Sequence, residues 1–101
     1  MKKIVEGKSY NTETAEDVAS FGNGLGRGDF SSYDETLYRT KKGAWFLAGE
    51  GGPMTKYSRP CSNMTSGGSD IFVLTPSEAQ KWLENHDETD AIAKHFTVEE
   101  A

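Results

Sequence analysis

The residues best suited to recognise a charged or aromatic partner lie between positions 38 and 46. Cations and aromatic rings are interleaved there: Tyr38, Arg39, Lys41, Lys42, Trp45 and Phe46. Rings that stack on bases, beside cations that contact phosphates, would form a platform for single-stranded nucleic acid. The net charge of −5 opposes this hypothesis, because phosphate neutralisation supplies much of the affinity of such platforms. The alternative is that Trp45 and Phe46 belong to the core, while the lysines keep a turn in solvent.

Residues for metal binding or nucleophilic catalysis are few. His86 and His95 are too far apart to share one helix face, where two metal ligands are separated by three or four positions. Cys61 is the only cysteine, which excludes a disulfide within the chain. Asp34 and Glu35 are adjacent, so on a strand they would point to opposite faces, the wrong geometry for joint acid–base catalysis. We therefore expect no enzyme activity, no metal and no cofactor.

A β-hairpin is the clearest strand feature. Residues 35–40 and 44–48 are rich in strand-forming side chains, and the loop between them ends in Gly43, which readily adopts the left-handed conformation of short hairpin loops. In the second arm, Trp45 and Phe46 point to opposite faces. This strand is therefore predicted either to be central, with both faces covered, or to have one face that awaits a partner.

A helix is predicted from residue 76 to about residue 85. Thr75 supplies a capping hydroxyl, Pro76 suits the first helical position, and Glu78 completes a capping box. The apolar stripe of this helix consists of Ala79, Trp82 and Leu83. The apolar run 71–74 leads directly into the cap and indicates a buried strand.

The remaining elements carry weaker signals. Residues 90–96 resume a helical pattern after a break at 86–89, and this short helix needs docking to be stable. Residues 3–5 and 8–10 predict a small hairpin at the N-terminus. Residues 17–21 indicate either another strand or the tail of a short helix.

Two glycine-rich stretches, 22–29 and 49–69, are predicted to be irregular. A connection as long as the second is typical of a binding loop or of disorder. With these connections, the chain is expected to be a single α+β domain spanning residues 1–101. A small, mostly antiparallel sheet of four to five strands occupies 1–74, and one or two helices from 75–101 pack on one of its faces.

Composition and charge refine this expectation. Leu, Ile, Val and Phe together number 17 of the 101 residues, so the core must rely on aromatic rings. Residues 1–59 carry nine basic and eight acidic side chains, whereas 60–101 carry two and eight. The acidic end is either an ordinary solvated face or a docking surface for a basic partner. No apolar run is long enough to span a membrane, and the first residues lack the apolar core of a secretory signal, so we expect a cytoplasmic protein.

Three segments carry a resemblance to other proteins. They are YxTETA at 10–15, LYRTKKGAWFLAGEGG at 37–52 and KY at 56–57. With them the chain resembles a family of uncharacterised proteins of similar length, common in gut bacteria and on plasmids, phages and integrative elements. The likeness also takes in the strand and helix at 67–84 and the acidic tail, and it supplies no catalytic residues. Small inhibitors of CRISPR–Cas nucleases come from the same genomic setting, and some are similar in size and acidity.

The function expected from these observations is that of a non-enzymatic protein-binding module of a mobile element, an inhibitor of a CRISPR–Cas or other defence nuclease. Its partner would be a protein, such as a Cas effector or its nucleic-acid complex. The alternative is a nucleic-acid-binding accessory or regulatory protein that uses the hairpin at 35–48. Two sets of residues are predicted to face a partner. The basic–aromatic set is Tyr38, Arg39, Lys41, Lys42, Trp45, Tyr57 and Arg59, and the acidic set is Glu84, Asp87, Glu88 and Asp90.

Overall fold

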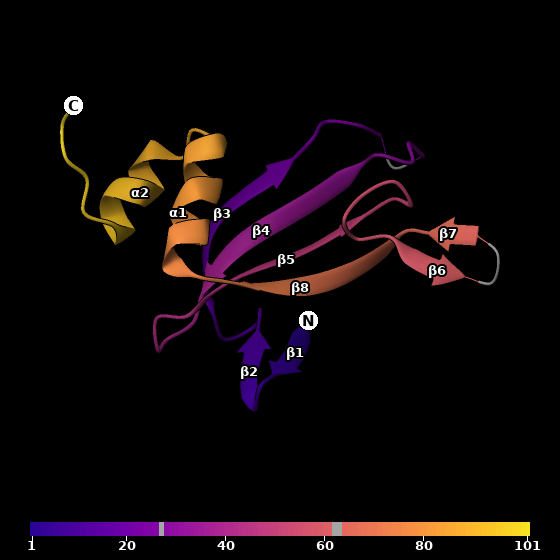
Figure 1. Cartoon of the computed structure of the whole chain (residues 1–101), viewed down its shortest axis with the longest axis horizontal. Helices are drawn as coiled ribbons and strands as arrows, with labels where there is room; N and C mark the ends of the chain where they lie inside the picture. Colours follow the sequence, from indigo (N-terminus) through magenta and orange to yellow (C-terminus); the bar gives the residue numbers. More distant parts are fainter. Residues whose placement is uncertain (27, 62–63) are drawn as a thin grey trace.

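A four-stranded antiparallel sheet forms the centre of the protein (Figure 1). The structure is a computed structural model that describes residues 1–26, 28–61 and 64–101, the side chain of Cys61 excepted. The strand order is β3-β4-β5-β8, and every neighbouring pair is antiparallel. The strands are β3 (Glu16–Gly22), β4 (Tyr33–Arg39), β5 (Trp45–Gly51) and β8 (Gly68–Leu74). Together with two helices, this sheet confirms the predicted α+β class.

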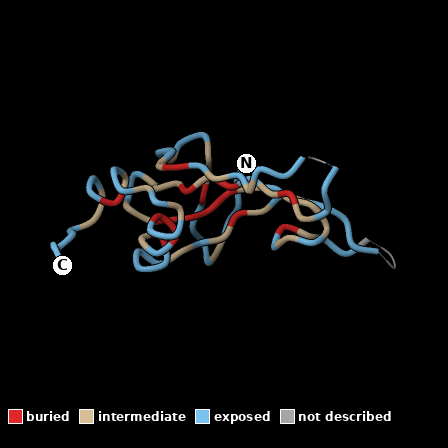
Figure 2. Tube along the Cα trace, turned by 90° about the horizontal axis from the view of Figure 1, so that it is seen from above, coloured by how far each residue is buried: buried red, intermediate tan, exposed pale blue. Residues whose placement is uncertain are grey.

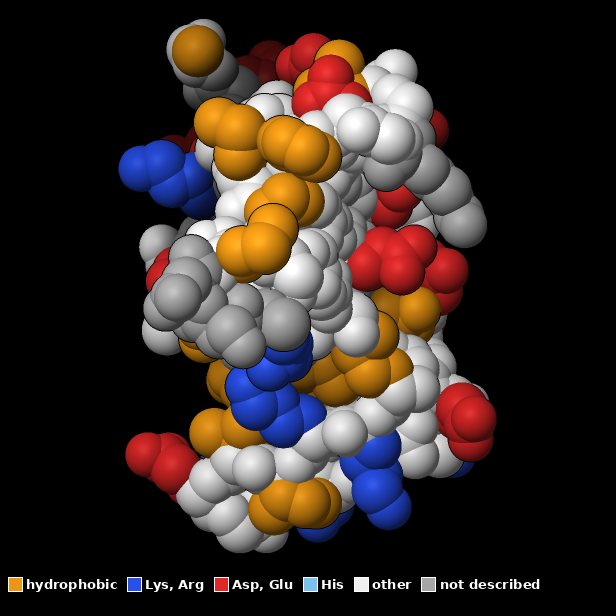
Figure 3. Space-filling model, turned by 90° about the vertical axis from the view of Figure 1, so that its right-hand side faces the viewer, with side chains coloured by type: hydrophobic (Ala, Val, Ile, Leu, Met, Phe, Trp, Pro, Cys, Tyr) orange, Lys and Arg blue, Asp and Glu red, His pale blue; other side chains and the backbone are white. Residues whose placement is uncertain are grey.

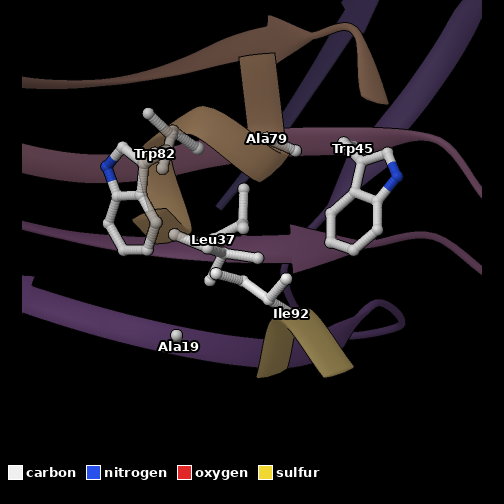
Figure 4. Close-up of a cluster of buried hydrophobic side chains, with 8 residues drawn as sticks. Ala19, Leu37, Trp45, Ala79, Trp82 and Ile92 are labelled. Carbon is white, nitrogen blue, oxygen red and sulfur yellow. The ribbon is translucent and has the colours of Figure 1, made fainter. Parts of the chain in front are cut away.

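Both helices cover the same face of the sheet, towards one end (Figure 1). Helix α1 (Pro76–Asn85) begins with the predicted capping box: the Thr75 hydroxyl accepts from the Glu78 backbone at 3.1 Å, and the Glu78 carboxylate accepts from the Thr75 backbone at 2.8 Å. Helix α2 (Thr89–His95) follows after a short turn. Figure 4 shows how side chains from sheet and helices meet in this layer. The buried cluster consists of Ala19, Leu37, Trp45, Leu47, Ala79, Trp82, Leu83 and Ile92.

Part of the opposite face of the sheet, around Phe46 and Ile71, is covered by a separate hairpin, β1 (Lys2–Val5) with β2 (Lys8–Asn11). The Tyr10 ring packs edge-on against Phe46, with 5.7 Å between the ring centroids. Strand β5 has the helix layer on one face and this hairpin on the other. It is therefore a central strand, the first of the two alternatives that the sequence left open, and not a strand with one face that awaits a partner. Figure 2 shows the buried residues concentrated along the middle of the flat molecule.

The stretch 49–69 is more regular than its glycine content suggested. Strand β5 continues to Gly51, β8 begins at Gly68, and between them β6 (Arg59–Cys61) pairs with β7 (Met64–Ser66). The prediction of one long irregular connection was therefore wrong. Glycine lacks the side chain that would signal a strand, yet Gly49 and Gly51 pair in register with Glu35 and Tyr33 of β4.

The β4–β5 loop has the predicted geometry. Thr40 and Ala44 close it through a backbone hydrogen bond of 2.8 Å, and the Thr40 hydroxyl accepts from the Ala44 backbone at 3.0 Å. Gly43 has a φ of +91°, a region in which other residues are strained. The loop therefore holds Lys41 and Lys42 in a fixed turn at one end of the sheet.

Candidate binding surfaces

Glu35 is a buried carboxylate at the centre of a hydrogen-bonded cluster. The residue is 4% exposed, and it lies on β4 facing the helix layer. Its Oε1 accepts a hydrogen bond from the Trp82 indole N–H at 2.7 Å. Its Oε2 accepts from the Tyr57 hydroxyl at 2.7 Å and lies 2.6 Å from the Lys56 Nζ. The cluster thus joins the sheet, helix α1 and the segment that follows β5.

The charge of Glu35 is stabilised by these donors. Burial raises its pKa, because a low-dielectric environment disfavours the ionised form. The hydrogen bonds from Lys56, Trp82 and Tyr57, with the charge of Lys56, outweigh burial and hold the pKa below its ordinary value. Burial, and then the hydrogen bond to Glu35, raises the pKa of Tyr57, which therefore stays protonated as a donor. Both oxygens of the carboxylate are engaged, so the cluster has a structural role.

Gly49 shows how tightly this cluster fits the sheet. A Cβ at this position would lie 2.6 Å from the Tyr57 hydroxyl oxygen and 2.8 Å from the Glu35 Cβ, and it would also meet the backbone oxygen of Asp34. Tyr57 is 1% exposed, and its ring crosses β5 where no side chain stands in the way. The cluster therefore anchors residues 52–58 to the sheet.

The loops at the end of the sheet remote from the helices are tied to one another. The Gly52 backbone donates to Ser32 at 2.8 Å, and the Met54 backbone donates to Phe30 at 2.9 Å. The Asn23 side chain organises the 23–32 loop, since its amide donates to the Ser31 backbone at 2.7 Å. Its carbonyl oxygen accepts from two backbone groups, at 3.3 Å each. These bonds tie the described residues on both sides of position 27 to the segment at 52–54.

Three apolar side chains are exposed on this frame, and we call them the loop-end surface. Leu25 is 45% exposed, Phe30 65% and Met54 72%. Figure 3 views the molecule from this end and shows hydrophobic side chains at the surface among acidic and basic ones. A cleft of about 600 Å³ lies beside Phe30, between the 28–34 segment and the glycines around residues 51 and 67.

The charged side chains that line this cleft are all acidic. They are Asp29, Asp34 and Glu50. Asp34 and Glu50 are directly opposite each other on β4 and β5, and neither has an ion-pair partner within the described ranges. Like charges in opposed positions of a sheet destabilise it. A cation placed in the cleft would be attracted to both carboxylates.

The structure divides the basic–aromatic set. Trp45 is 3% exposed and packs against Phe96, with 5.2 Å between ring centroids, so it forms part of the core as Tyr57 does. Tyr38 is half-buried and stacks on Phe46, whereas Lys41 and Lys42 are exposed. The rings that a nucleic-acid platform would need are largely inside the fold. The guanidinium of Arg39 lies 5.3 Å from the centroid of the Trp45 ring. Arg59 is far from the other members of this set: it lies on β6 at the other end of the molecule, where its side chain donates to the Ser69 backbone.

The acidic set stays together near the junction of α1 and α2. Glu84, Asp87 and Asp90 are exposed, and Glu88 is half-buried. Asp87 also ends helix α1: it has a φ of +56°, and its backbone N–H bonds to the Glu84 carbonyl while that of Glu88 bonds to Leu83. This is a Schellman ending, in which an acidic residue occupies the position that glycine favours.

The two histidines have packing roles. His86 stacks on Phe21, with ring centroids 3.8 Å apart, and His95 meets the edge of Trp45 while its Nε2 lies 3.3 Å from a Glu16 oxygen. Across residues 1–26, 28–61 and 64–101, no three His, Cys, Asp or Glu side chains gather as metal ligands would. The helices described in this structure are too short and polar to cross a membrane.

Comparisons with protein-family models, with curated proteins and with solved structures found no match. The fold itself defines the class of protein, a small α+β domain with a four-stranded antiparallel sheet.

The loop-end surface was not among the residues predicted from the sequence. Phe30 lies in a polar segment, and Met54 follows a proline, so neither belongs to a periodic pattern. Two weaker signals were present. Asn23 lies between two glycines, where its side chain can hydrogen-bond to the backbone of its own loop. Phe30 is a large apolar residue within a loop, where it is not expected to contribute to a core.

Proposed function

We propose that the chain is a non-enzymatic protein-binding module whose partner docks on the loop-end surface. The observation that carries this proposal is the exposure of Phe30 and Met54 on two loops that are hydrogen-bonded to each other. Exposed apolar side chains on neighbouring loops are typical of interaction sites, and the backbones of Phe30 and Met54 are joined by a hydrogen bond. Hydrogen bonds that already join the two loops also reduce the entropy lost on association.

The cleft beside this surface suggests the chemistry of the partner. Because Asp34 and Glu50 are opposed there and form no ion pair with the residues that the structure describes, the partner is expected to place a lysine or arginine in the cleft and an apolar group against Phe30. A positively charged partner also suits the acidic set, which lies at the other end of the molecule.

Affinity capture with matched variants tests the proposal. The wild-type chain, the double variant Phe30→Ser with Met54→Ser, and a control pair, Ile4→Ser with Val98→Ser, are immobilised and exposed to a bacterial lysate. All four residues are large, apolar and exposed, but Ile4 and Val98 lie elsewhere. We expect proteins captured by the wild type and the control to be lost from the first variant. Identical capture by all three would refute the proposed surface.

A finer proposal is that the partner is a defence nuclease, such as a CRISPR–Cas effector. It rests on the sequence resemblance, and it is supported by charge, since nucleases present basic surfaces to nucleic acid. The test is plasmid or phage targeting by a panel of CRISPR–Cas systems in cells that express the chain. Protection that disappears in the Phe30→Ser, Met54→Ser variant is expected. If targeting is unaffected throughout the panel, the nuclease proposal fails, while the capture experiment still decides whether the chain binds a protein.

A further inference from the structure

A basic groove lies at the other end of β4 from the loop-end surface. It is formed between the β1–β2 hairpin and the β4–β5 loop and has a volume of about 440 Å³. We define the basic groove by Lys8, Thr14, Thr40, Lys41 and Lys42, which line it. The Tyr10–Phe46 contact holds the two hairpins together beneath it.

The cations of the groove are available to a ligand. Lys8, Lys41 and Lys42 are exposed, and none forms an ion pair with a residue in the described ranges. This concentration of unpaired positive charge occurs in a chain whose net charge is −5. Mixed with the lysines are the hydroxyls of Thr14 and Thr40, and the lining also includes apolar parts of Tyr10 and Ala44.

A second cleft, of about 470 Å³, adjoins the groove. It shares Thr14, Thr40, Lys41 and Lys42 with the groove and adds Ala15, Glu16 and Arg39, and the Glu16 carboxylate lies 3.5 Å from the Lys94 Nζ. The Arg39 Nε is buried and has no hydrogen-bond partner among the described atoms, which is unusual for a charged donor. The guanidinium of Arg39 adds positive charge to the wall of this second cleft.

We propose that the basic groove binds an acidic, partly apolar peptide segment of a partner protein. Carboxylates match the lysines and the Thr40 hydroxyl, and an apolar side chain matches Tyr10 and Ala44. Nucleic acid fits less well, because Trp45 and Phe46, the rings next to these lysines in the sequence, are buried in the core and cannot stack on bases. The groove is separate from the loop-end surface, so this proposal is independent of the one above.

The test uses a fluorescein-labelled peptide of alternating glutamate and leucine, followed by fluorescence anisotropy. A peptide with glutamine in place of glutamate and a labelled thymidine oligonucleotide are the comparison probes. The variant Lys41→Glu with Lys42→Glu is compared with Lys2→Glu with Lys81→Glu, which changes the net charge equally at exposed lysines elsewhere. Thermal unfolding followed by circular dichroism verifies the fold, and Lys41→Gln with Lys42→Gln replaces the first variant if it does not fold.

The groove proposal predicts saturable binding of the glutamate peptide by the wild type, weaker binding at higher salt, and little binding of the glutamine peptide. Substitution of Lys41 and Lys42 is expected to weaken binding about tenfold or more, and substitution of Lys2 and Lys81 much less. Equal weakening by both double variants would show that only net charge matters and would overturn the proposal. Tighter binding of the oligonucleotide than of the peptide, or no binding of the peptide, would also overturn it.

Discussion

Trp82 donates its indole N–H to Oε1 of Glu35 over 2.7 Å, and this bond joins helix α1 to the central sheet. The same carboxylate receives the Tyr57 hydroxyl on its other oxygen. One buried charge therefore positions both the helix layer and the segment that carries Met54. This relationship links the stability of the fold to the order of the loop-end surface.

The indole hydrogen bond can be isolated by comparing two tryptophans. Trp82→Phe leaves Oε1 of Glu35 without its donor, whereas the Trp45 indole makes no hydrogen bond to the described residues. Because an unsatisfied buried acceptor costs about 1–3 kcal/mol, Trp82→Phe is expected to lower the free energy of unfolding by about that much more than Trp45→Phe. Urea denaturation measures both. Equal losses would mean that the bond contributes nothing.

The depressed pKa of Glu35 predicts a pH dependence of stability. A carboxyl group whose pKa is lower in the folded state stabilises the fold above its unfolded pKa, and this contribution is lost as pH falls through the folded value. Wild-type stability should therefore decline on acidification below the ordinary pKa of 4.5. Glu35→Gln cannot titrate, so the difference in unfolding free energy between the two proteins should shrink from pH 7 to pH 3. A constant difference over that range would contradict the assignment.

The end of helix α1 offers a stabilising substitution. Asp87 has a positive φ, which glycine adopts without strain, and its negative charge lies at the helix C-terminus, where the dipole disfavours it. Asp87→Gly is expected to raise the free energy of unfolding by about 0.5–1 kcal/mol. Asp90→Gly, within α2, is the control and should lower it. Thermal and urea unfolding measure the free energy of unfolding of both variants. A less stable Asp87→Gly protein would show that the positive φ and the charge of Asp87 do not destabilise the wild type.

The opposed carboxylates of Asp34 and Glu50 predict opposite effects on stability and binding. Glu50→Gln removes the repulsion and should stabilise the free protein by about 0.2–1 kcal/mol. The same change should weaken capture of a basic partner. A double-mutant cycle with Asp34→Asn measures the coupling between the two groups. If Glu50→Gln lowers stability, the pair is not a source of strain.

The sequence was most informative where structure depends on near neighbours. The capping box at Thr75 and Glu78 and the turn at Gly43 were both predicted, because each is decided within four residues. The opposite faces of Trp45 and Phe46 followed from strand alternation. The C-terminal part of β5 was not predicted. Gly49 lies in this strand because the Tyr57 hydroxyl, from a later segment, occupies the space that a side chain at position 49 would need.

The candidate site was harder to predict because its parts are distant in sequence. Glu35 meets Tyr57 and Trp82, which are 22 and 47 positions away, so no local pattern reveals the cluster. Asp87 was predicted from the sequence only as a member of the acidic set. Its positive φ, which the sequence does not reveal, shows that it ends helix α1. Phe30 is conspicuous only once the core is known to exclude it.

Photo-crosslinking tests the central proposal, docking on the loop-end surface, most directly. Benzoylphenylalanine replaces Phe30, a conservative change at a side chain that is 65% exposed, and replaces Ile4 in a control protein. Both proteins are irradiated in a bacterial lysate, and the adducts are identified by mass spectrometry. A discrete protein adduct is expected from position 30 and not from position 4. Adducts from position 4 alone, or the same adducts from both positions, would contradict the proposal.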